Sequence, residues 1–237
     1  MIKSIIHKIF SNQWRARYFT PYFIFIRNTR KKSYRQCGTH TDLYGPLTLD
    51  PHHVTLEEYT RLQPNIQVIT AGGTFKVRKY SAIGASCTII PGNHIPTVGL
   101  PQYLSSLHIN DTATEIIVEE DAWVGARCIL LSHCHIGRGA VVAAGSTVTK
   151  EVLPYAVVAG SPCKTIAVRF SIEQILQHEA ILYPPEERLK REYLEELFAS
   201  HYQGMRTIGT SEISSEDAKK LTLTKKEIGI PNYESRQ

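Results

Sequence analysis

The sequence lacks the two features that direct many chains out of the cytoplasm. Its five cysteines are odd in number and form no CxxC pair, so they indicate a reducing compartment and no disulfide framework. Long apolar runs are also missing, because the aromatic-rich stretch 18–26 contains Pro21 and is too short to span a bilayer. It also lacks the pattern of a signal peptide. We therefore expect a cytoplasmic protein.

Acidic residues are absent from the first 41 positions, which hold nine of the 27 lysines and arginines. The rest of the chain carries the remaining 18 lysines and arginines and all 22 acidic residues, so it is net acidic. The basic character therefore belongs to the N-terminal arm, residues 1–35. Apolar residues at helical spacing over 2–14 predict an amphipathic helix with a basic side. This helix either makes peripheral contact with the inner face of an anionic membrane or packs on the rest of the protein. We expect no nucleic-acid partner.

Six hexapeptides follow one another in unbroken phase from Val118 to Leu153. The first position of each is aliphatic, and the fifth is small in five of the six. The first positions are Val118, Val124, Leu130, Ile136, Val142 and Val148. A period of six matches neither a helix nor an ordinary strand, whose apolar faces recur every 3.6 and 2.0 residues. It predicts a mainly β protein with a parallel β-helix, in which each short segment sends one large side chain inward.

The same phase is present upstream of this run. It occupies Val77, Ile83 and Ile89, with a less regular trio at Leu56, Leu62 and Val68. Residues 36–76 therefore predict one or two irregular opening coils. After Ile89 the next first position would be residue 95, yet the phase resumes only at Val118. Residues 95–117 are thus an inserted loop, and a loop that breaks a periodic scaffold often carries function.

Two runs within the repeats, DAWVGARCILL and HIGRGAVVAAGSTVTKEVLPYAVVAGSPCK, resemble a known family. They are similar to the hexapeptide-repeat acyltransferases, in their sugar and xenobiotic O-acetyltransferase branch, and to bacterial surface-polysaccharide acetyltransferases. The resemblance covers roughly residues 54–170. It implies a left-handed β-helix over 36–170, a homotrimer with active sites between subunits, and acetyl-coenzyme A as donor. The handedness rests on the family alone, because it departs from the usual crossover preference.

The expected reaction is transfer of an acetyl group to a sugar hydroxyl during polysaccharide biosynthesis, with a carbohydrate acceptor that is free or lipid-linked. Such a transfer needs a base, donors for the oxyanion, and two substrates held together. His94 ends the last hexapeptide before the insertion, and the family's catalytic histidine occupies the corresponding position. Asn93 is expected to orient His94 or a substrate hydroxyl. The group that orients the His94 ring stays open between Asp111, Glu115 and a backbone carbonyl.

A tryptophan and a set of small and basic residues are the candidate donor contacts. Trp123 occupies a solvent-facing position, and the resemblance implies that it lines the acetyl and pantetheine channel; packing between subunits would also explain it. Backbone amides are expected to hold the donor, and basic residues to meet its phosphates. The resemblance assigns these roles to Gly125, Ala126, Ala144, Gly145, Thr149, Lys150 and Lys164.

The cysteines argue against an acyl-enzyme. Cys87, Cys128 and Cys134 occupy small fifth positions of the repeat, where we expect them to be buried packing residues. Cys163 has no evident base nearby in the sequence. Direct transfer in a ternary complex is therefore the favoured mechanism.

The chain after the repeats predicts helices and a tail. Ser171 and Gln174 form a capping box for a helix over 171–182. A second helix is expected over 185–201, so that C-terminal helices fill 171–203. The polar segment 204–237 is expected to be partly disordered.

Three alternatives remain beside O-acetylation. The first is N-acetylation of an amino sugar. The second is a zinc hydratase, suggested by His133 and His135, which lack a third ligand at a convincing spacing; we expect no metal. The third is a non-catalytic β-helix scaffold.

Overall fold

The computed structural model describes residues 20–70 and 72–234. The helix predicted over 2–14 lies outside these residues. The chain divides into two compact units. The first comprises the chain up to Pro154 together with Val158–Lys164, and the second comprises Tyr155–Val157 and the chain from Thr165 onward.

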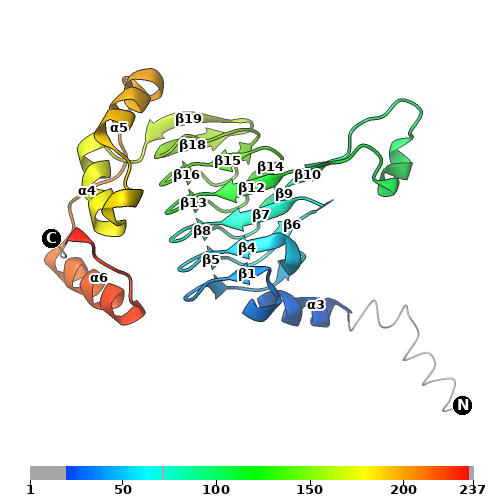
Figure 1. Ribbon diagram of the computed structural model, residues 1–237, viewed down its shortest axis with the longest axis horizontal. Coiled ribbons are helices and arrows are strands. Elements are labelled where there is room, and N and C mark those ends of the chain that lie inside the picture. The colour runs from blue at the N-terminus through cyan, green and yellow to red at the C-terminus, as the bar shows by residue number, and fades with distance from the viewer. Residues whose placement is uncertain (1–19, 71, 235–237) are drawn as a thin grey trace, which may run out of the picture. The chain divides into compact units, whose positions relative to one another are not determined.

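The first unit is built from three sheets of short, parallel-paired strands (Figure 1). The first sheet contains β1 (Gln36–Cys37), β4 (Val54–Leu56), β7 (Thr74–Val77), β12 (Glu115–Val118) and β15 (His135–Ile136). The second contains β2 (Asp42–Leu43), β5 (Arg61–Leu62), β8 (Ala82–Ile83), β13 (Trp123–Val124) and β16 (Val141–Val142). Its strand order continues with β18 (Ala156–Gly160) and β19 (Cys163–Val168), each of which has residues in both units. The third contains β3 (Leu47–Thr48), β6 (Ile66–Val68), β9 (Thr88–Ile90), β14 (Ile129–Leu131) and β17 (Thr147–Val148).

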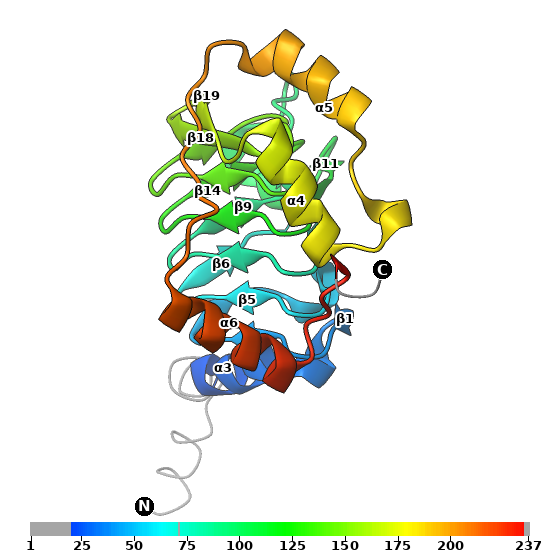
Figure 2. The same cartoon turned by 90° about the vertical axis from the view of Figure 1, so that its left-hand side faces the viewer.

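Apart from an inserted pair, β10 (Gly92–Asn93) and β11 (Thr112–Ala113), the strands from β1 to β17 visit the three sheets in rotation, and each of them pairs in parallel with its counterpart one coil away. Val124 in β13, for example, is in register with Ile83 in β8 on one side and Val142 in β16 on the other. Figure 2 shows the strands of successive coils stacked upon one another. The parallel pairing confirms the mainly β prediction and is consistent with the β-helix that the sixfold period predicted, with two coils in the segment 36–70 before the regular repeats.

The core follows the hexapeptide phase. Every first position from Val77 to Val148 has no exposed surface, and Leu56 and Leu62 are equally buried. The small fifth positions are buried as well; Cys87 and Cys128 are fully enclosed and Cys134 is 1% exposed. One inward aliphatic side chain per segment, with a small residue before each corner, therefore forms a continuous interior.

Part of the N-terminal arm packs on the first coil. Helix α3 (Thr20–Thr29) contacts β3, and a short 3-10 turn, η2 (Lys31–Ser33), follows it. The buried Asn28 donates from Nδ2 to the carbonyls of Leu47 (2.8 Å) and Leu49 (2.9 Å), which attaches the helix to the coil. A second 3-10 turn, η3 (Pro51–His53), precedes β4. Packing on the protein is thus observed for the described part of the arm.

The second unit contains the C-terminal helices. The predicted first helix is confirmed as α4 (Ile172–Leu182), with Ser171 and Gln174 forming the capping box. The predicted second helix is wrong at its start, because a 3-10 turn η5 (Pro185–Glu187) comes first and α5 (Arg191–Leu197) begins later. Its end agrees with the expected residue 201 to within one residue, since a π-helical turn η6 (Phe198–Tyr202) continues α5. The Arg188 guanidinium explains the late start, because it donates to the carbonyls of Tyr183 (2.9 Å) and Ala180 (3.1 Å) at the end of α4.

The polar tail is more ordered than its composition suggested. Residues 215–228 form α6 (Ser215–Ile228), so the expectation of disorder is wrong for this stretch. Ser214 caps its first turn by accepting from the Asp217 amide (3.1 Å), and Gly229 ends it in the left-handed conformation. Among the described residues, no helix has the length and apolar character needed to cross a membrane.

Removing one inward side chain should destabilise the fold far more than changing an outward neighbour. Leu62→Ala should lower the free energy of unfolding by about 2–5 kcal/mol, because Leu62 is fully buried and its loss leaves a cavity. Gln67→Ala, at an exposed position on β6, should change it by no more than about 0.5 kcal/mol. Urea unfolding at one fixed protein concentration measures both, and equal losses would contradict the assigned phase.

Candidate active site

The inserted loop leaves the stacked coils of the first unit between the third and first sheets. Strands β10 (Gly92–Asn93) and β11 (Thr112–Ala113) pair antiparallel as a ribbon, and a 3-10 segment η4 (Gln102–Leu107) lies farther out, away from the stacked coils (Figure 1). The loop between the ribbon strands is residues 94–111, shorter than the 95–117 expected. β11 is still part of the inserted ribbon, and the chain rejoins the stacked coils at β12, where Glu115 is in register with Thr74. The first-position rule therefore placed the return to the coils, at Val118, a few residues too late.

His94 stands where the ribbon becomes the loop, and its ring has a carboxylate partner. His94 Nδ1 lies 2.9 Å from Asp111 Oδ1, and His108 Nδ1 lies 2.7 Å from Asp111 Oδ2. The hydrogen bond from His108 is the main cause that lowers the pKa of Asp111. Desolvation of the carboxylate opposes this shift, and the hydrogen bond from His94 lowers the pKa further. Asp111 is therefore an ionised acceptor at neutral pH, and both Nδ1 atoms act as donors.

This pairing decides which group orients His94. Of the alternatives left open by the sequence, Glu115 instead accepts a hydrogen bond from Thr74 Oγ1 (3.1 Å), and Asp111 holds the imidazole. With the proton on Nδ1, the lone pair of the His94 ring is on Nε2, and 43% of the side chain is exposed. The geometry suits a general base that faces solvent or substrate.

Asn93 is bound to the scaffold beside His94. Its Nδ2 donates to Ser132 Oγ, one coil farther along the same corner. The corners between β9 and β10, after β14 and after β17 form one edge, because these strands pair in register at Ile89, Leu130 and Val148. We call this the histidine edge (Gly92–His94, Ser132–His133 and Thr149–Lys150). Thr149 and Lys150 are exposed on it.

The other expected donor contacts form a second edge, between the second and third sheets. We call it the glycine edge (Gly84, Gly125–Ala126 and Ala144–Gly145). The Gly145 amide donates to the Ala126 carbonyl (2.8 Å), so the two pairs lie on neighbouring coils. A Cβ on Gly125 would meet the Ala144 nitrogen at 2.6 Å, and one on Gly84 would meet the Ala126 nitrogen at 2.5 Å. The close approach of the coils thus requires glycine at both positions.

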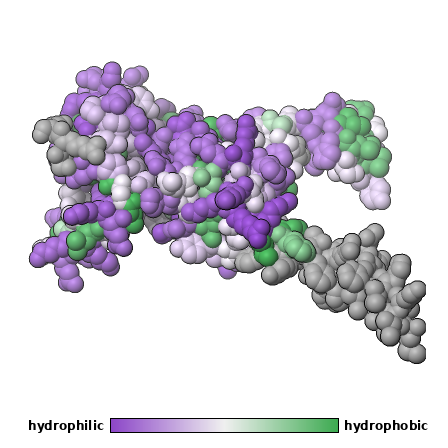
Figure 3. All heavy atoms as spheres, turned by 60° about the horizontal axis from the view of Figure 1, so that its bottom comes forward, coloured by the Kyte–Doolittle hydropathy of each residue, from purple (hydrophilic) through white to green (hydrophobic). Residues whose placement is uncertain are grey.

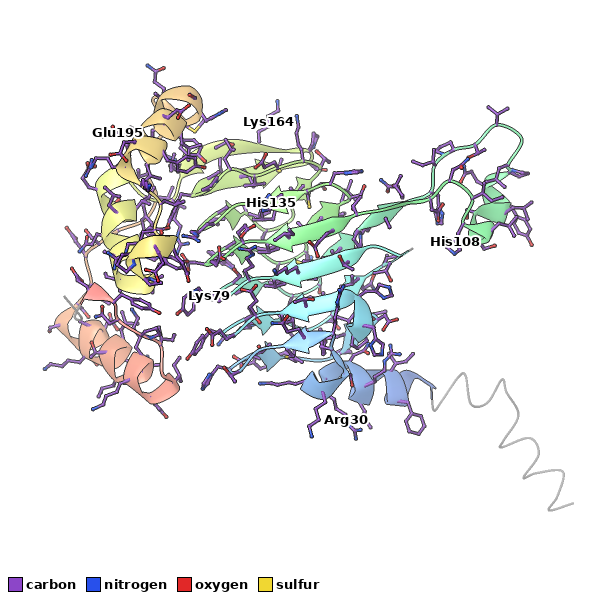
Figure 4. The ribbon with its side chains drawn as sticks, viewed as in Figure 1. Arg30, Lys79, His108, His135, Lys164 and Glu195 are labelled. Carbon is purple, nitrogen blue, oxygen red and sulfur yellow. The ribbon has the colours of Figure 1, made fainter. Side chains whose placement is uncertain are left out.

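Trp123 lies on β13, two residues before the glycine edge. It stands in register with Ala82 and Val141 on the neighbouring coils, and 57% of its surface is exposed. Lys164 is exposed on β19 and is visible near the end of the stack in Figure 4. Within one chain, the structure therefore brings the small residues and Trp123 together but keeps His94 and Lys150 on a different edge.

The cysteines are positioned as packing residues. Burial raises the pKa of Cys134 to about 12 and also raises that of Cys163, which nearby Lys150 partly offsets. The hydrogen bond with Cys87 lowers the pKa of Cys128 to about 7, but Cys128 has no exposed surface. A buried thiolate cannot reach a thioester, so Cys87, Cys128 and Cys134 are poor nucleophiles whatever their charge. Cys163 is half-buried, and its raised pKa disfavours the thiolate.

Of the two histidines that suggested zinc, His135 is engaged by a carboxylate and His133 is exposed. His135 Nε2 lies 2.7 Å from Glu119 Oε1, and Glu119 also pairs with Arg78 at 3.2 Å. Figure 4 shows His135 on the stacked strands and His108 on the distant insertion. Within the described chain, the one group of three metal-ligating side chains is His94, His108 and Asp111. Sequence reasoning missed His108, because only the folded loop brings it to Asp111.

The outer part of the insertion exposes apolar side chains. Val98 is fully exposed, and Tyr103 and Leu107 are 93% and 58% exposed. Figure 3 shows hydrophobic side chains gathered toward the free end of this segment. An exposed apolar patch of this kind commonly marks a contact surface.

Comparison with known proteins identifies the repeat. Residues 115–150 match the bacterial transferase hexapeptide family (six repeats). The chain carries the bacterial transferase hexapeptide repeat. The resemblance to hexapeptide-repeat acyltransferases is thereby confirmed, and the parallel sheets are consistent with the left-handed β-helix that it implies.

Related sequences with this hexapeptide repeat are acetyltransferases. Chloramphenicol acetyltransferase of Morganella morganii is 40% identical over 75 residues, 32% of this chain and 36% of the relative. 2,3,4,5-Tetrahydropyridine-2,6-dicarboxylate N-acetyltransferase of Staphylococcus aureus (strain Newman) is 38% identical over 76 residues, 32% of each chain. The matched segment spans about a third of these relatives.

Solved structures share the hexapeptide-repeat fold over more of the chain. A maltose O-acetyltransferase from Clostridium difficile 630 has a TM-score of 0.53 at 17% identity, and the match covers 71% of this chain and 84% of the maltose O-acetyltransferase chain. A galactoside acetyltransferase in complex with coenzyme A has a TM-score of 0.52 at 16% identity, and the match covers 73% of this chain and 87% of the galactoside acetyltransferase chain. At this identity the likeness establishes the fold alone.

The close approach at the glycine edge gives a prediction. Gly125→Ala should lower the free energy of unfolding by about 1–3 kcal/mol, because the added methyl group meets the backbone of the next coil. Ala144→Ser, at an exposed position of the same edge, should change it by no more than about 0.5 kcal/mol. Thermal and urea unfolding measure both. A Gly125→Ala protein as stable as the wild type would show that the coils have room for a side chain there.

Proposed function

We propose that the protein is an acetyl-coenzyme A-dependent O-acetyltransferase that acts on a sugar hydroxyl in bacterial surface-polysaccharide biosynthesis. The observation that carries the proposal is the exposed His94 imidazole, held by Asp111 at 2.9 Å where the insertion leaves the repeats. The kinship of the repeat to acetyltransferases supports the donor, and the fold shared with maltose and galactoside acetyltransferases supports a sugar acceptor.

The chemistry follows from the His94 tautomer. Nε2 accepts the hydroxyl proton while the hydroxyl oxygen attacks the thioester carbonyl. A C–O bond forms, the C–S bond breaks, and the proton passes from His94 to the departing thiolate. Asp111 keeps Nδ1–H directed away from the substrate and stabilises the imidazolium that forms in between. Transfer is direct, because Cys87, Cys128 and Cys134 are buried and the raised pKa of the half-buried Cys163 disfavours its thiolate.

The donor is proposed to lie along the glycine edge. Small residues at Gly125 and Gly145 let a thin pantetheine arm approach the backbone amides of Ala126 and Ala144, because the Gly125 and Gly145 amides already donate to the Val142 and Ala126 carbonyls (2.8 Å each). Trp123 forms the channel wall beside the acetyl group, and Asn93 helps orient the acceptor. Thr149, Lys150 and Lys164 meet the phosphates of coenzyme A.

A homotrimer would bring the two edges into one site. His94 and the glycine edge belong to different corners of one chain, so a complete site needs the histidine edge of one copy against the glycine edge of another. A left-handed triangular β-helix with threefold symmetry supplies three such junctions. The exposed apolar side chains of the insertion would then lie over a neighbouring copy or an acceptor.

The N-terminal arm is proposed to bring the enzyme to lipid-linked acceptors at the inner face of the membrane. Exposed Phe23 and Ile24 on α3 lie in a segment that also carries Arg27, Arg30 and Lys31. An apolar pair beside clustered cations suits a peripheral contact with anionic lipid.

N-acetylation of an amino sugar is the second candidate. It is favoured by one observation, the 38% identity to an N-acetyltransferase over the repeat region. Paired acceptors that differ only in a hydroxyl or an amino group at one carbon separate the two reactions.

Loss of the proposed base should abolish most of the activity. His94→Ala should lower kcat about 10²–10⁴-fold, because the hydroxyl then has no acceptor for its proton. Thioester consumption from acetyl-coenzyme A with a panel of sugars measures the effect. His40→Ala, which removes an exposed histidine from the corner between β1 and β2, outside both edges, is the matched control and should retain full turnover. Unchanged turnover in His94→Ala would contradict the mechanism.

The composite site predicts complementation between two inactive variants. His94→Ala and Ala126→Trp damage different edges, so each homotrimer should be inactive. In a randomly mixed trimer one junction of three retains both intact edges, and an equal mixture should recover about a quarter of the wild-type activity.

The complementation experiment uses co-unfolded and refolded mixtures, with each variant refolded alone as the control. Activity that stays at the level of the single variants, despite mixed trimers seen by native mass spectrometry, would contradict a site shared between copies.

A further inference from the structure

The cluster of His94, His108 and Asp111 has a donor set that general-base catalysis does not require. One ligand atom from each of the three residues lies within 4.8 Å of the others. Both carboxylate oxygens of Asp111 are engaged, one by each imidazole, and only 10% of this side chain is exposed. Orienting His94 needs one oxygen of Asp111 and makes no use of His108.

The loop around this cluster is held in shape. His108 follows η4 in the left-handed conformation (φ 53°, ψ 40°), and Asn110 adopts the same region (φ 58°). Such backbones are costly for residues with a side chain and persist where other contacts hold them. One such contact is the hydrogen bond from Asn110 Nδ2 to Thr97 Oγ1 across the loop (3.1 Å). The turn from His108 to Asp111 is therefore arranged before any ligand arrives.

We propose that His94, His108 and Asp111 form a binding site for a divalent transition-metal ion of the zinc class. Two imidazole nitrogens and one carboxylate oxygen are ligands that zinc accepts, and three protein ligands leave a position for water. With bonds of about 2.1 Å, tetrahedral ligands lie roughly 3.4 Å apart. The present separations, 2.9 Å from His94 Nδ1 to Asp111 Oδ1 and 2.7 Å from His108 Nδ1 to Asp111 Oδ2, lie below this value, and all three ligand atoms lie within 4.8 Å of one another, so side-chain shifts of about 1 Å bring them to coordinating positions. Both histidines are exposed enough to let it enter.

Metal uptake has a consequence for His94 that rests on the proposed function. A neutral imidazole that coordinates through Nδ1 carries its proton on Nε2, so each ring shifts one proton and none is released. His94 Nε2 then donates a hydrogen bond and no longer accepts the proton of a hydroxyl. The bound ion should therefore inhibit acetyl transfer, and a chelator should restore it.

Cobalt(II) gives a readout of the site that is independent of activity. The full-length protein, free of any polyhistidine tag, is titrated with Co²⁺ while the visible absorption bands of the bound ion are followed. The wild type and His133→Gln should give the same bands and the same Kd. His108→Gln should lose the bands or bind at least tenfold more weakly, because it loses one of three ligands. Circular dichroism of all three proteins checks that they are folded alike.

The outcomes separate this inference from the proposed function. Absence of bands in the wild type, or equal affinity in folded His108→Gln, would overturn the metal site and leave the catalytic proposal untouched. Bands that depend on His108, together with full thioester turnover in saturating Co²⁺, would establish the site and instead contradict the role of His94 as base.

Discussion

The burial of one aliphatic side chain in every six residues is the interaction on which the structure depends. Each such side chain, for example Val124 or Leu130, is fully enclosed and stabilises the fold by about 1.5–3 kcal/mol before conformational entropy is charged. The corners must then be narrow enough for the coils to stack. Gly84 and Gly125 meet this requirement, because the next coil approaches within 2.5–2.6 Å of where a Cβ would stand. Core and corners together give a rigid rod.

That rigidity explains how the scaffold tolerates its insertion. Strand β12 pairs directly with β7, with Val118 opposite Val77, although the whole loop lies between the two coils in sequence. The ribbon of β10 and β11 closes the loop at its base, and there the loop carries His94. The proposed base therefore stands on a backbone fixed by strand pairing, next to the loop that would meet the acceptor.

Local signals were reliable where they involved few residues close in sequence. The Ser171–Gln174 capping box marked the start of α4, and the phase of Val77 to Val148 marked the core. Predictions failed where a contact from elsewhere intervened, as when Arg188 bonded to the carbonyls ending α4 and delayed α5. The helix at 215–228 was missed because polar composition outweighed a valid cap at Ser214 and a glycine stop at Gly229.

The sequence by itself determined the winding of this protein, because a period of six residues is compatible with coils and with neither a helix nor a two-residue strand alternation. It also marked His94 by its position before the break in the repeat. Only the tertiary structure decided that Asp111 holds this ring, that His108 joins them, and that the glycine and histidine edges lie apart in one chain. These depend on how a nonperiodic loop folds and on which corner each residue occupies, and neither is encoded by neighbours along the chain.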